Sequence, residues 1–144
     1  MPAEILKSKD AYDPRRLFGV TTLDVVRSKT FLGKSIGAQP KEGISPVIDG
    51  HAGLTILPVL SQSRPPFLSN EAERLSLFHR IQEAGTEVVK AKAGLDSATL
   101  SMAYAGARFV GSLIRGIKKE SDECIVGCTF CESDVSEVKF FRST

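Results

Sequence analysis

Apolar residues recur at helical spacing in three long stretches of the chain, each preceded by polar residues that can cap a helix. The predicted helices cover residues 22–36, 71–93 and 98–111, and Gly37 and Gly94 end the first two. The third consists mostly of small residues, so we expect it to pack closely on several sides. The expected inner faces are Leu23, Val26, Thr30, Lys34 and Phe31 in the first helix, and Leu75, Phe78, Ile81, Val88 and Val89 in the second.

Short β-branched runs predict strands between and after the helices. Residues 47–48 and 55–57 flank a glycine-rich turn, and residues 124–130 and 135–141 are expected to pair as a hairpin through residues 131–134. Residues 1–18 are polar and mixed, which indicates a connecting segment before a domain over residues 19–144. The predicted fold is therefore α+β, with long helices packed on a small, largely antiparallel sheet.

The composition is that of an ordinary globular protein, with 42% hydrophobic and 25% charged residues among 144. This length suits one domain, or one half of a two-domain protein. A net charge of only +2, without a basic block, gives little support for nucleic-acid binding. No apolar run is long enough to span a membrane, and neither end of the sequence matches a targeting signal.

Three cysteines, Cys124, Cys128 and Cys131, have the spacing C-x3-C-x2-C. In a strand, where each residue rises about 3.3 Å and side chains alternate between faces, the last two would lie roughly 10 Å apart. That separation is too long for a disulfide. We therefore expect structural thiols in a reducing compartment and no metal site. His79 has no second ligand at helical spacing, which favours a surface position.

His51 lies between two glycines in Gly50-His51-Ala52-Gly53, where a tight turn would present its side chain at an edge. Imidazole suits proton transfer near neutral pH, although a single turn histidine often has no such role. Asp24 and Arg27 share one face of the first predicted helix. If they meet His51, the carboxylate would orient the imidazole and the guanidinium would grip a substrate carboxylate. Removing a hydroxyl proton in this way needs a hydride acceptor, and a nicotinamide is the usual one.

Longer motifs carry a resemblance to a known family. They are YDPRRLFGVTTLDVVR at 12–27, GHAG at 50–53, TILP at 55–58, IQEAGTEVVKAK at 81–92 and SATLSMA at 97–103. Together they resemble the second half of the NAD-dependent malate dehydrogenases of the mitochondrial type, over most of residues 11–141. The resemblance implies interconversion of malate and oxaloacetate with NAD, and a homodimer built partly from helices 22–36 and 71–93. It also implies location in a mitochondrion, glycosome or peroxisome rather than secretion.

Six site residues follow from the resemblance. His51 matches the proton acceptor, Asp24 its carboxylate partner, and Arg27 an arginine that grips a substrate carboxylate. Ser97 and Thr99 match positions by the substrate pocket, and Met102 matches a position near the nicotinamide. For Met102, sequence spacing alone would instead favour a role in filling the core.

The chain departs from the family in two respects. Asp49 stands where the family usually has glycine, and its carboxylate would repel a dicarboxylate substrate if it faced the site. The G-x-G-x-x-G fingerprint does not occur, because the nucleotide-binding half would precede Met1 and the family's long C-terminal helix would follow Thr144. The chain alone is therefore expected to be inactive. A non-enzymatic chain that keeps the fold and dimer surface stays an alternative, and a lactate dehydrogenase domain is a weaker one.

Overall fold

The computed structural model describes residues 1–120, 127–132 and 141–143. Its helices are α1 (Pro2–Lys7), α2 (Thr22–Ile36), α3 (Glu71–Ala91) and α4 (Thr99–Lys118). Its strands are β1 (Gly19–Val20), β2 (Val47–Asp49), β3 (Ile56–Pro58), β4 (Thr129–Glu132) and β5 (Phe141–Ser143). None of the helices in these residues is both long and apolar enough to cross a lipid bilayer.

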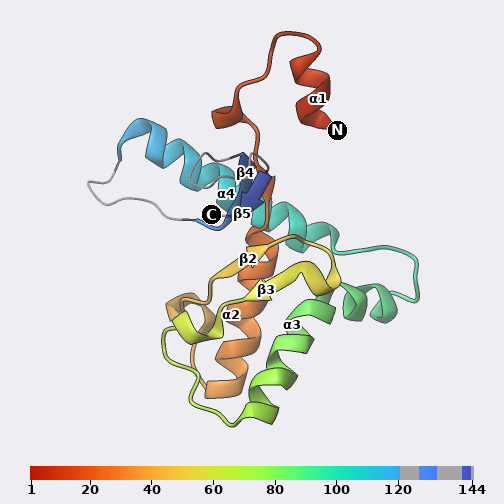
Figure 1. Ribbon diagram of the computed structural model, residues 1–144. Helices are drawn as coiled ribbons and strands as arrows, with labels where there is room; N and C mark the ends of the chain where they lie inside the picture. The colour runs from red at the N-terminus through yellow and green to blue at the C-terminus, as the bar shows by residue number, and fades with distance from the viewer. Residues whose placement is uncertain (121–126, 133–140, 144) are drawn as a thin grey trace.

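Two long helices and one hairpin enclose the main core. Figure 1 shows α2 and α3 side by side, with the β2–β3 hairpin lying across them. Fully burying one aliphatic side chain contributes about 1.5–3 kcal/mol, so a cluster joining all three elements fixes their relative positions. The buried cluster consists of Leu32 from α2, Val47 and Ile56 from the hairpin, Leu60 after it, and Leu77 and Ile81 from α3.

The strands form two small antiparallel sheets. In one, β2 pairs with β3, so that Val47 lies opposite Pro58 and Asp49 opposite Ile56. The other has the strand order β1-β4-β5. Helices on small antiparallel sheets confirm the predicted α+β class. The predicted turn is wrong at Cys131, which lies within β4 opposite Arg142 because the pairing extends through Glu132. The predicted strand residues 124–126 and 135–140 lie outside the described residues.

Helix α2 covers the predicted residues, and Gly37 ends it in the left-handed conformation with φ of 69°. The predicted inner face is wrong in part, because Lys34 is exposed and two polar residues, Asp24 and Ser28, are buried instead. Hydrogen bonding removes much of the cost of burying them. The Ser28 and Ser45 hydroxyls, for example, lie 2.6 Å apart.

Helix α3 begins with a reciprocal cap. The Asn70 side chain accepts from the Glu73 N–H at 2.9 Å, and the Glu73 carboxylate accepts from the Asn70 N–H at 3.3 Å. This confirms the predicted start, whereas the helix ends at Ala91, before the predicted residue 93. Leu75 and Val89 are exposed, contrary to prediction, because the buried face is rotated towards Leu77, Ile81, Gln82 and Ala84.

Helix α4 continues to Lys118, seven residues beyond the predicted end. It packs against α2, but only Ala105 of its described residues is fully buried. The expected close packing on several sides is therefore wrong for the described part of the chain. Its exposed apolar side chains include Leu100, Leu113 and Ile117.

The N-terminal segment contacts the β1-β4-β5 sheet through a side-chain hydrogen bond. The Tyr12 hydroxyl donates a hydrogen bond to the Glu132 carboxylate in β4, which raises the pKa of Tyr12 to about 12. Near the same sheet, Cys128 is a free thiol just before β4. Cys124 lies outside the described residues, and the described ones contain no cluster of potential metal ligands.

The last residue of β2 has a strained backbone, which suggests a stability test. Asp49 has φ of 71°, a conformation that costs most L-residues about 1–2 kcal/mol, and aspartate somewhat less. Asp49→Gly is expected to raise the free energy of unfolding, measured with urea, by about 0.5–1 kcal/mol. Asp49→Ala controls for loss of the charge and should lower stability. A glycine variant less stable than the parent would contradict this assignment of strain.

Candidate active site

His51 lies in a tight turn between β2 and β3. The Gly50 N–H donates to the Thr55 carbonyl at 2.9 Å, and the Ala52 N–H donates to the Thr55 hydroxyl at 3.2 Å. A Cβ atom at Gly50 would lie 2.3 Å from that hydroxyl, so glycine is required for the turn to close. The turn leaves the His51 side chain 47% exposed, as the sequence predicts for a histidine presented at an edge.

Asp24 lies in the first turn of α2 and is 0% exposed. Its Oδ2 atom is 2.5 Å from Nδ1 of His51, so the expected contact between the two residues is present. An ionised carboxylate can only accept, so Nδ1 carries the proton in this bond. When the ring is neutral, Nε2 therefore carries no proton. An unprotonated Nε2 is what the ring needs in order to accept a proton from another molecule.

Arg27 approaches the same carboxylate from one turn along α2. Its Nη1 atom is 3.6 Å from Oδ1 of Asp24, a distance that gives charge attraction without a hydrogen bond. Within the described residues, Oδ1 is buried and has no hydrogen-bond partner. The guanidinium therefore balances the charge of Asp24 while its N–H groups are not committed to that oxygen.

The pKa of His51 is raised above its ordinary value. The main cause is the hydrogen bond with the Asp24 carboxylate, which favours the charged imidazolium. Partial burial and the positive charge of Arg27 act in the opposite direction. The net effect is an imidazole that holds a proton more tightly than a free histidine does.

A pocket of about 260 Å³ opens beside this pair. His51 and Arg27 line it together with Ser97 and Met102, so four of the six expected site residues share one cavity. Asp24 is not a lining residue, because it lies buried behind the imidazole. Thr99 also does not line the pocket.

Two further observations bear on the predicted site. Asp49 is exposed and is not among the residues that line the pocket, so its carboxylate does not face the cavity. Sequence reasoning assigned no site role to α3, yet Gln82, Gly85 and Thr86 line the pocket. They belong to the motif at residues 81–92, and their spacing of three and four places them on one helix face. That spacing is the signal that would have identified them.

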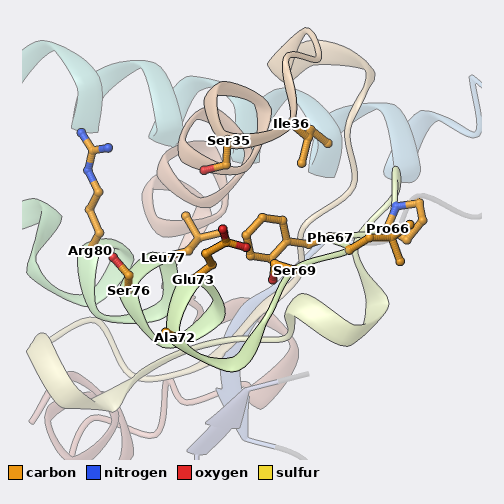
Figure 2. A pocket seen from close by; sticks show the side chains of 11 residues that line it. Ser35, Ile36, Pro66, Phe67, Ser69, Ala72, Glu73, Ser76, Leu77 and Arg80 are labelled. Atoms are coloured by element: carbon orange, nitrogen blue, oxygen red, sulfur yellow. The ribbon is translucent and has the colours of Figure 1, made fainter.

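A larger cavity, of about 870 Å³, lies between the end of α2 and the start of α3 (Figure 2). Its charged side chains already have partners: the Arg80 guanidinium is 4.5 Å from the centre of the Phe31 ring, and Glu73 caps α3. No histidine or cysteine lines it. The smaller pocket is therefore the candidate active site, since it is lined by His51, whose ring is hydrogen-bonded to Asp24.

Comparison with known proteins shows the family to which the chain belongs. Residues 21–142 match the lactate/malate dehydrogenase α/β C-terminal domain. The chain belongs to the lactate/malate dehydrogenase family. Glyoxysomal malate dehydrogenase from Oryza sativa subsp. japonica is 52% identical to this chain over 141 residues. Mitochondrial malate dehydrogenase from Caenorhabditis elegans is 53% identical over 142 residues.

Each of these alignments covers 98% of this chain but only 39% or 41% of the relative, so the chain spans about two fifths of their length. Solved structures share the fold. Malate dehydrogenase from Salinibacter ruber has a TM-score of 0.77 at 17% identity, covering 98% of this chain and 46% of that one. Lactate dehydrogenase from Eimeria maxima, solved with NADH and oxamate, has a TM-score of 0.74 at 14% identity, covering 98% and 44%.

The raised pKa of His51 predicts a pH-dependent contribution to stability. The folded domain binds the proton more tightly than the unfolded chain, so this contribution is fully present below the unfolded pKa. It is lost as the pH rises through the higher folded pKa. The stability difference between the parent and His51→Asn should therefore shrink across that window, measured by urea unfolding at a series of pH values. His79→Asn, at an exposed position, is the control, and a difference that grows with pH would contradict the prediction.

Proposed function

We propose that this domain is the substrate-binding and catalytic half of an NAD-dependent L-malate dehydrogenase, which interconverts malate and oxaloacetate. One observation carries the proposal: a histidine hydrogen-bonded to a buried aspartate shares a small pocket with an arginine. The relatives named as malate dehydrogenases, about half identical over nearly the whole chain, support the same reading.

In this proposal His51 moves the proton. Its Nε2 atom accepts the hydroxyl proton of malate, while Nδ1 stays bonded to Asp24. The carboxylate keeps the ring in the required tautomer and stabilises the imidazolium that forms. In the reverse direction the imidazolium returns the proton to the oxygen of oxaloacetate. The raised pKa of His51 suits this second role, because it favours the protonated imidazolium that donates the proton.

Arg27 orients the substrate. Its planar guanidinium can donate two parallel hydrogen bonds to a carboxylate, and it lines the pocket next to His51. Oriented in this way, the substrate hydroxyl would face the imidazole. Ser97 is proposed to contact the substrate from the pocket wall. Thr99, the first residue of α4, is proposed as a further substrate-binding residue.

NAD, when bound, would accept the hydride released as the hydroxyl proton leaves. The residues present fit its nicotinamide end: Met102 lines the pocket and is 36% exposed, which offers an apolar contact to a flat ring. The 144 residues contain no G-x-G-x-x-G turn to cradle the phosphates. We infer that this domain holds the substrate and touches only one edge of the cofactor.

A homodimer through the outer sides of α2 and α3 is part of the proposal. Leu75 is exposed on α3, which leaves apolar surface on this helix. The alternative is a non-enzymatic chain that keeps the fold and this surface. Activity in a complete enzyme separates the two possibilities.

A chimera tests the role of Arg27. This domain would replace the matching part of the Caenorhabditis elegans enzyme, which supplies the remainder of the polypeptide. Arg27→Ala in the chimera is expected to lower kcat/KM for oxaloacetate by the equivalent of about 2–5 kcal/mol, because a charge-assisted bidentate contact is lost. Arg27→Lys keeps the charge without the fork and should fall between. Steady-state kinetics measure all three.

Arg74→Ala is the matched control, since Arg74 pairs with Glu71 on the exposed side of α3. It should leave kcat/KM near the parent value. An Arg27→Ala chimera with nearly normal efficiency would refute the substrate role. A folded parent chimera without any activity would favour the non-enzymatic alternative.

The 144-residue chain by itself is expected to be catalytically silent. Hydride transfer needs the nicotinamide held close to the substrate carbon, and most of the binding energy of NAD has no partner in these residues. Purified chain should oxidise no NADH with oxaloacetate above background, and calorimetry should detect no NAD binding. Turnover that His51→Asn abolishes would prove this expectation wrong.

A further inference from the structure

The turn that carries His51 has almost no apolar anchor. Residues 51–55 are all exposed, and Leu54 is 78% exposed. The first buried side chain after the turn is Ile56 in β3. Hydrophobic packing therefore fixes the hairpin strands but not the turn itself, so polar contacts must set the position of the imidazole.

Side-chain hydrogen bonds reach this turn from two helices within the described part of the chain. From α2, Asp24 holds the imidazole. From α3, the Gln82 amide donates to the Leu54 carbonyl at 3.3 Å and to the Ile56 carbonyl at 3.0 Å. Gln82 is only 5% exposed, although glutamine is usually a surface residue. A buried glutamine that bonds two carbonyls on either side of Thr55 is well placed to hold the turn.

We propose that Gln82 is a positioning residue for His51: its amide fixes the turn against α3 so that the imidazole reaches Asp24. The inference rests on the proposed function for what His51 does chemically. The coupling between Gln82 and the turn can be measured without catalytic turnover. The positioning role of Gln82 can therefore fail while the proposed function stands, and the reverse is also true.

The chemistry of the amide suits this role. It supplies two N–H donors for the two carbonyls and carries no charge, so it does not disturb the neighbouring charges of Asp24 and Arg27. Glycine one turn further along α3 completes the arrangement. A Cβ atom at Gly85 would lie 3.7 Å from Nη1 of Arg27, so this helix face lies close to the arginine as well as to the turn. Helix α3 thus sets the position of the turn relative to Arg27.

Gln82→Met tests the proposal in the 144-residue chain. Methionine has a similar length but no hydrogen-bond donor, so the turn should become more mobile. The hydrogen bond between His51 and Asp24 should then be formed in a smaller fraction of molecules. The NMR titration midpoint of the His51 ring is then expected to fall by about 0.5 unit or more, towards that of a free histidine. His79, exposed on the same helix, is the second histidine of the chain and serves as an internal reference that should not move.

Two variants separate positioning from general destabilisation. Gln62→Met makes the same chemical change at an exposed glutamine and should leave the His51 midpoint unchanged. Leu77→Ala removes core packing on α3 and should lower stability while leaving the midpoint within about 0.2 unit of the parent. If Gln82→Met folds and keeps the parent midpoint, or if Leu77→Ala shifts it equally, the proposal is wrong.

A measurement on the unaltered chain applies even if Gln82→Met does not fold. The side-chain amide signals of Gln82 should shift with pH at the same midpoint as the His51 ring, because the turn joins the two groups. The amide signals of Gln39 and Gln62, which are exposed, should show no shift with that midpoint. Gln82 signals that stay constant through the His51 titration would overturn the proposal.

Discussion

A buried carboxylate imposes the main constraint on this domain. Asp24 is fully removed from solvent, and an uncompensated charge in such a place would cost several kcal/mol. The N-terminal end of α2 favours a negative charge, but this partial compensation is modest. His51 and Arg27 supply the rest, one by a hydrogen bond and the other by charge attraction. The hairpin turn and α2 must therefore meet where they do.

The same constraint links stability to chemistry. A carboxylate that needs a donor orients the imidazole, and the orientation leaves the opposite ring nitrogen free to exchange protons. The apolar cluster of α2, α3 and the hairpin brings these elements near one another, but polar contacts set the final geometry of the exposed turn. A core of this kind tolerates small adjustments in packing, whereas the polar contacts depend on individual atoms.

The sequence predicted elements whose boundaries depend on local chemistry. Gly37 ends α2 in a left-handed conformation and Asn70 caps α3, and both signals act within one turn of helix. The contact of His51 with Asp24 came from the family motifs, because no spacing rule joins residues 27 positions apart. The buried faces were harder to predict. Ser28 and Gln82 are polar yet buried, since each meets a partner from a distant segment that a periodicity argument does not include.

The second sheet has a consequence for the order in which the polypeptide assembles on the ribosome. Strand β1 pairs with β4, and Val20 lies opposite Thr129, so this pairing cannot form until more than a hundred further residues have been synthesised after β1. The pocket instead draws its residues from Leu23 to Met102. Helix α2, the hairpin and α3 emerge in sequence, and their shared core requires none of the later strands. We expect the Asp24–His51 contact to form in a nascent chain before β1 pairs with β4.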